Sequence, residues 1–222
     1  MKRIFLLSLL CLTACGTPTP MPDAVKVNPQ AAPATPSQNG LGDSFYPLLG
    51  NAGYDVTHYE ITLDVDPIAN RIEGTTVIEA VALEDLSQFN LDLYGLKVDS
   101  VLVNGESTEF SRYQMELVIS PGAPGEAPGL RERNTVQSKR AWITANESFT
   151  VIVSYHGSPK PVGDDGIHML SGWQAMPGGT FVASEPSGAM TWFPCNNHWS
   201  DRATFTFNIT VPEGYDIIAN GV

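Results

Sequence analysis

The sequence predicts a mostly β domain built from antiparallel strands, and two observations carry that prediction. Several segments alternate apolar and polar residues with a period of two, which is typical of half-buried strands. No segment repeats apolar residues at helical spacing over three turns, and the 20 glycines and 17 prolines can supply turns between short strands. Strands joined by such short turns favour antiparallel hairpins over parallel crossovers.

The expected strands follow one another from residue 54 onward. Residues 54–66 alternate for much of their length and residues 67–70 form a turn. Residues 71–83 are rich in Ile, Val and Thr, so the two strands should form a hairpin. Asn104 and Gly105 make a tight turn farther along. The other expected strands are 89–93, 98–103, 113–119, 149–155 and 203–211, the last with Phe205, Phe207 and Ile209 on one face.

Residues 1–14 have the pattern of a secretory signal peptide. A short cationic start, Met-Lys-Arg, precedes an apolar run that is far shorter than the roughly 20 residues of a membrane-spanning helix. Residues 12–15, Leu-Thr-Ala-Cys, resemble the lipobox of bacterial lipoproteins, in which the cysteine is lipidated and becomes the new N-terminus. Cys15 is therefore the expected lipidation site. The alternative is a plain signal peptide with an incidental cysteine.

The next segment is rich in proline and cannot bury enough apolar area to order itself. Residues 16–42 hold six prolines among small and polar residues. Residues 15–43 are therefore expected to be the lipidated cysteine and a disordered tether, and residues 44–222 the β domain. A stably anchored lipoprotein of this kind would be extracytoplasmic and held at the membrane of the cell envelope.

The chain is acidic, with 24 Asp and Glu against 12 Lys and Arg and a formal net charge of −12. Removal of the leader takes away Lys2 and Arg3 and leaves 10 basic against 24 acidic side chains, or −14. Such a surface argues against nucleic acid as a partner and against electrostatic docking on anionic lipid. The three cysteines are too few for a disulfide framework.

Residue types that carry catalysis elsewhere lack their usual spacing here. No histidine begins an H-E-x-x-H pair, so the sequence shows no zinc site of its own. Two aspartate pairs could ligate calcium, but without the other loop ligands they are better interpreted as turn carboxylates. Two serines near a glutamate lack a nucleophile elbow and an obvious base. These residues are His58, His156, His168, His198, Asp64, Asp66, Asp164, Asp165, Ser184 and Ser187.

Residues 166–205 are dense in aromatic residues, glycine and proline, and we expect a loop with a positioned function that leads into a strand. They contain Glu-Pro-Ser at 185–187, Trp-Phe-Pro-Cys at 192–195 and Arg-Ala-Thr-Phe at 202–205. In this they closely resemble the N-terminal domain of the zinc aminopeptidases of the aminopeptidase N type. Residues 53–59 and 93–105 match the same family, in the same order.

The resemblance implies a saddle-like β domain that packs against a thermolysin-like catalytic domain. In the family, that second domain carries H-E-x-x-H and a distant glutamate as zinc ligands, together with a Gly-x-Met-Glu-Asn motif. Glu185 matches the glutamate that binds the free α-amine of the substrate. A carboxylate pairs well with an ammonium group, whereas an amide nitrogen cannot offset its desolvation. The alternative for Glu185 is a loop carboxylate that caps a turn.

Other residues of the motif have plainer expected roles. Cys195 is expected to be a small buried residue and not a nucleophile. Trp173, Trp192 and Phe193 are expected in the core or in a pocket wall. The family usually has Asp where this chain has Asn197, which keeps the hydrogen-bonding shape and loses the charge. It commonly has Pro where this chain has Trp199.

The chain stops at Val222, before the last strands of the family's first domain, so we expect the N-terminal part of a longer protein with an unpaired sheet edge. The intact protein would be a zinc aminopeptidase acting on peptides, with zinc in the missing catalytic domain, and this stretch alone would be inactive. Two alternatives remain open. One is a non-catalytic lipoprotein that binds peptides or glycans, and the other is a two-domain scaffold that has lost its zinc ligands.

Overall fold

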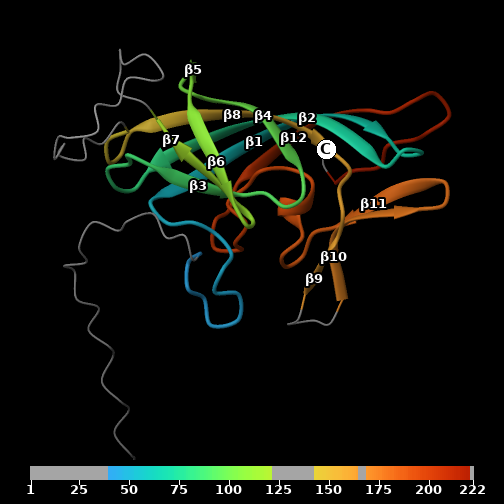
Figure 1. Ribbon diagram of the computed structural model, residues 1–222, viewed down its shortest axis with the longest axis horizontal. Helices are drawn as coiled ribbons and strands as arrows, with labels where there is room; N and C mark the ends of the chain where they lie inside the picture. Colours follow the sequence, from blue (N-terminus) through green and yellow to red (C-terminus); the bar gives the residue numbers. More distant parts are fainter. Residues whose placement is uncertain (1–39, 122–142, 165–168, 221–222) are drawn as a thin grey trace, which may run out of the picture. The chain divides into compact units, whose positions relative to one another are not determined.

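The computed structural model describes residues 40–121, 143–164 and 169–220 (Figure 1). Every described residue belongs to the compact unit Ala34–Val222. The expected signal peptide, Cys15 and most of the expected tether lie outside the described residues. Within the described residues, no helix has the length and apolar character needed to cross a membrane.

Three sheets make up the described unit (Figure 1). The largest has the strand order β12-β1-β2-β8-β4-β5, and all its neighbours are antiparallel except β1 and β12, which run parallel. Its strands are β1 (Tyr54–Asp66), β2 (Arg71–Ala82), β4 (Lys97–Val103), β5 (Glu106–Ser107), β8 (Ser148–Gly157) and β12 (Thr204–Thr210).

The two smaller sheets have three antiparallel strands each, in the orders β3-β7-β6 and β11-β10-β9. A short 3-10 turn, η1, follows the second of them. The elements are β3 (Phe89–Asp92), β6 (Glu109–Tyr113), β7 (Glu116–Ser120), β9 (Val162–Asp164), β10 (Met169–Met176), β11 (Gly179–Ala183) and η1 (Ala189–Thr191).

The antiparallel β class predicted from the sequence is confirmed, and so is the hairpin of β1 and β2. The turn at Asn104 and Gly105 is also present, with positive φ angles of 51° and 82°. The single strand expected at 113–119 is wrong, because the chain turns at Gln114 (φ 53°) and makes two strands, β6 and β7. The expected loop is wrong over residues 169–183, which form the hairpin of β10 and β11.

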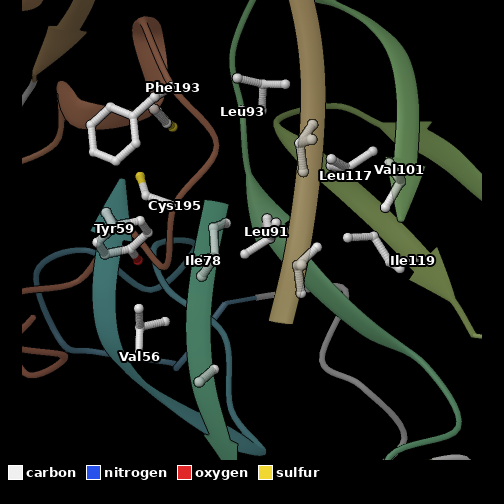
Figure 2. Close-up of a cluster of buried hydrophobic side chains, with 14 of the residues drawn as sticks. Val56, Tyr59, Ile78, Leu91, Leu93, Val101, Leu117, Ile119, Phe193 and Cys195 are labelled. Carbon is white, nitrogen blue, oxygen red and sulfur yellow. The ribbon is translucent and has the colours of Figure 1, made fainter. Parts of the chain in front are cut away.

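The core lies between the large sheet and the sheet of β3 and β7. Figure 2 shows Leu91 and Leu117, from the small sheet, meeting Ile78 and Val101 from the large one. Alternate residues of β1 are buried, as its period-two pattern predicts. Each large apolar side chain buried in this way contributes about 1.5–3 kcal/mol relative to exposure. The strands around this core support the turns and loops that hold the candidate functional residues.

Candidate functional site

Glu185 lies two residues after the end of β11, and its peptide bond to Pro186 is cis. Its side chain is exposed. Among the hydrogen bonds of the described residues, the Glu185 carboxylate accepts none from a backbone N–H, so nothing there supports the alternative of a turn cap. The carboxylate is therefore available to a ligand.

Two glycines press the turn that carries Glu185 against β10. A Cβ atom built on Gly188 would lie 2.1 Å from the backbone nitrogen of Gly172, and one built on Gly172 would lie 2.7 Å from the carbonyl oxygen of Gly188. Gly172 also has a φ of +96°, which residues with side chains rarely adopt. The two backbones can approach this closely only because both residues lack a side chain.

The hydroxyl of Ser171 faces the same turn from β10. Ser171 is 1% exposed, and its Oγ lies 3.2 Å from the carbonyl oxygen of Ala183 and 3.3 Å from those of Ser184 and Glu185. The indole Nε1 of Trp192 donates to Ser184 Oγ at 3.2 Å. Both serine side chains thus help to hold the turn.

Asn197 ties the far end of the turn to the following segment. Its Nδ2 donates to the carbonyl oxygen of Ser187 at 2.7 Å, and its backbone nitrogen donates to Asp92 Oδ2 at 2.9 Å. The aspartate usual in the resembled family could not donate this first bond as a carboxylate. The change to asparagine therefore gives this chain a neutral link between the Glu185 turn and its support.

Trp199, the second departure, packs against the segment that leads into β1. Its ring stacks on His198 at 4.1 Å between centroids and meets the edge of Tyr46 at 5.4 Å. In the same segment, Leu41 donates its backbone N–H to Leu49. The ordered contacts of the unit thus reach residues 40–43, the end of the range expected to be tether.

Trp173, Phe193 and Cys195 are buried as expected, and Trp192 is partly buried and lies in a pocket wall. Cys195 is a free thiol in the core, where burial raises its pKa well above the ordinary value, so it is not a reactive nucleophile. The ring of Phe193 meets Tyr59 at 5.5 Å, and Figure 2 shows Cys195 beside them. Trp173 is buried and donates its Nε1 to Asn70 Oδ1 at 2.9 Å.

A pocket of about 640 Å³ opens next to the Glu185 turn. Ser184 is part of its wall, so Glu185 follows the pocket directly in the chain. Most of the wall is apolar or aromatic, which suits a covering surface or a ligand with apolar groups. The wall residues with aromatic or branched side chains are Leu63, Val65, Trp173, Phe181, Val182, Trp192, Phe207, Ile209, Val211, Ile217 and Ile218.

The residues suggested as calcium ligands do not form a metal site where the structure describes them. Asp66 Oδ1 accepts the backbone N–H groups of Ile68 and Ala69, at 3.0 and 2.9 Å, so it stabilises the turn as expected. The described residues contain no cluster of three or more His, Cys, Asp or Glu side chains that could hold a metal ion. Asp165 and His168 lie outside the described residues.

The sequence reasoning missed a buried pair of carboxyl groups. Asp92 and Glu116 are direct partners across β3 and β7, and they are 0% and 5% exposed. Burial raises the pKa of Asp92 to about 7, and burial with the nearby Asp92 charge raises the pKa of Glu116 to about 8. Asn51 Nδ2 donates to Asp92 Oδ2 at 3.1 Å, and Arg112 offsets part of the Glu116 charge. An acidic residue between Leu91 and Leu93 in a short expected strand was the available signal.

This pair predicts that the protein is more stable in acid than in alkali. Both carboxyl groups hold their protons to higher pH in the folded state than in the unfolded chain, so the contribution is complete below their ordinary pKa values and falls as pH rises through about 7 to 8. Asp201, whose pKa is raised to about 6, acts in the same direction. Urea unfolding should show a lower midpoint at pH 9 than at pH 5, and Asp92→Asn should reduce the difference. A midpoint that rises with pH would contradict this assignment.

Comparisons with known proteins identify solved structures that have a similar fold. No family model matches the chain. The structure is similar to an M1 zinc metallopeptidase from Deinococcus radiodurans, with 30% identity, a TM-score of 0.64, and coverage of 78% of this chain and 36% of that one. A variant of the same enzyme bound to a Tyr-Ser-Ala substrate gives the same values. The chain therefore spans about a third of the length of these relatives.

More distant structures share the fold alone. Yeast LTA4 hydrolase matches with 21% identity and a TM-score of 0.51, over 72% of this chain and 23% of that one. Legionella pneumophila aminopeptidase A, in complex with aspartic acid, matches with 17% identity and a TM-score of 0.51, over 71% of this chain and 16% of that one.

Proposed function

We propose that this chain, whose fold matches structures of M1 zinc metallopeptidases over 78% of its length, anchors substrates in a zinc aminopeptidase that removes N-terminal residues from peptides. The observation that carries the proposal is the Glu185 turn. An exposed carboxylate that caps no described backbone N–H lies on a turn held by buried hydrogen bonds and a glycine contact. The whole enzyme's activity belongs to a chain longer than the one described.

The proposed chemistry of Glu185 is the recognition of a free α-amine. A carboxylate forms a charge-assisted hydrogen bond with an ammonium group, and it discriminates against an amide nitrogen only when water is excluded from the pair. Glu185 is exposed in the described unit, so another part of the protein must cover it. Holding the amine would set which peptide bond reaches the reacting centre.

The surface beside Glu185 suits such a cover. The exposed side chains of Phe181, Val182, Ile217 and Ile218 line the same pocket as Ser184, the residue before Glu185. Exposed apolar surface of this kind is typical of an interface. We take its partner to be the protein's own C-terminal catalytic domain.

Zinc would be bound by that catalytic domain. The described residues of this chain do not fit a zinc site, because they bring together no cluster of three metal-ligating side chains. The contribution of this chain is therefore substrate binding, and we assign it no metal-dependent step.

The proposal also includes an extracytoplasmic location, with the protein anchored through a lipid on Cys15. It rests on the lipobox resemblance of residues 12–15 and on the proline-rich segment that follows. In bacteria that make the protein, Cys15→Ser should move it from the membrane fraction to the soluble fraction. Cys11→Ser is the matched control and should leave it with the membrane. Equal membrane association of both variants would contradict the anchor.

The amine-binding role is tested by Glu185→Ala in the intact protein. The value of kcat/KM for a peptide with a free N-terminus should fall by about 100-fold, or about 2.7 kcal/mol, because a buried, hydrogen-bonded charge pair would lose one partner. The melting temperature should stay within a few degrees, since the side chain is exposed. The measurement is the steady-state hydrolysis of peptides that begin with a free-amine alanine. Their N-acetylated forms are the substrate control.

Glu213→Ala is the matched control variant, because Glu213 is an equally exposed glutamate in a turn after β12. It should leave kcat/KM unchanged. An unchanged kcat/KM in Glu185→Ala would overturn the anchor. An intact wild-type protein that hydrolyses no free-amine peptide would overturn the enzyme itself.

A further inference from the structure

We propose that Ser171 is a positioning residue for Glu185, with a buried hydroxyl that fixes the backbone carrying the amine-binding carboxylate. The inference rests on the proposed function and adds to it the group that sets the position of the anchor. Ser171 lies at the end of the β9-β10 pairing, where it is opposite Val162, and only 1% of it is exposed. It has no contact with a substrate site of its own, so it would act through Glu185.

Three consecutive carbonyl oxygens converge on the Ser171 hydroxyl. They belong to Ala183, Ser184 and Glu185, at 3.2, 3.3 and 3.3 Å from Oγ. Carbonyl oxygens repel one another, and a single hydroxyl proton placed among them relieves that repulsion. Ser184 also accepts the backbone N–H of Gly188 at 2.7 Å. The Glu185 carbonyl has Ser171 as its hydrogen-bond partner among the described residues.

The hydroxyl is also enclosed by the glycine contact. A Cβ atom built on Gly188 would lie 2.5 Å from Ser171 Oγ, so the hydroxyl occupies the space between the turn and β10 that the missing side chain leaves. The main chain on both sides is therefore too close for a water molecule to replace the hydroxyl without movement of the turn.

Loss of the hydroxyl should displace Glu185 without unfolding the domain. The Glu185 carbonyl oxygen would lose its partner among the described residues, and those of Ala183 and Ser184 would each lose a contact, which favours a turn that moves away from β10 toward water. Glu185 would move with it, and a misplacement of about 1 Å can lower a rate by up to about 100-fold. The effect should appear in the binding of the free amine, and hence in KM.

A double-mutant cycle in the intact protein tests this route. Ser171→Ala should lower kcat/KM for free-amine peptides by about tenfold, mainly through KM. In a Glu185→Ala background the same substitution should have no further effect on kcat/KM, because the anchor is already gone. Ser171→Cys, which keeps a weak donor on a larger atom, should recover part of the loss.

Thr76→Val is the matched control for loss of a buried hydroxyl. Thr76 is 0% exposed, lies in β2, and places its Oγ1 3.2 Å from the Tyr155 hydroxyl. It should lower the melting temperature and leave KM for the free-amine peptide unchanged. A change in KM as large as that of Ser171→Ala would show that loss of stability alone moves KM, and would overturn the inference.

The outcomes separate the two proposals. Suppose that Glu185→Ala lowers kcat/KM. If Ser171→Ala then lowers kcat/KM equally in the wild-type and Glu185→Ala proteins, or in neither of them, the positioning role is wrong while the anchor stands. If Glu185→Ala has no effect, the anchor is wrong and Ser171 has nothing to position. If the wild-type protein is inactive on free-amine peptides, the proposed function and this inference are both overturned.

Discussion

The backbone contact between Gly172 and Gly188 is the constraint on which the rest of the site depends. It brings β10 against the turn after β11, so that Ser171 reaches three carbonyl oxygens. A side chain at either glycine would separate the two segments. The exposed Glu185 carboxylate thus stands on a rigid base even though its own side chain caps no described backbone N–H.

The core and the site are stabilised by different interactions. The large sheet is held by apolar burial, as Ile61 and Tyr155 illustrate, and the Glu185 turn is held by glycine packing and polar contacts. Between them lies the buried pair Asp92 and Glu116, and Asp92 accepts the backbone N–H of Asn197. Stability and site geometry are therefore linked through Asp92, whose charge changes near neutral pH.

Much of the sheet could be predicted from the sequence, because β1, β2 and β8 alternate between two environments. The hairpin of β10 and β11 could not, since both of its ends are exposed and its burial does not alternate. Glu185 could be found from its motif. Its support could not, because Ser171 lies fourteen residues away and its role depends on how the backbones cross. The sequence shows that Asn197 departs from the resembled family. Its hydrogen bond to Ser187 depends on how the two segments fold against each other.

The most direct test of the central claim is a crystal structure of the intact protein with a bound free amino acid. The account predicts the α-amine within hydrogen-bonding distance of the Glu185 carboxylate, water excluded from the pair, and the turn still in contact with Ser171 and Gly172. An amine held by other groups, with Glu185 left in solvent, would contradict it.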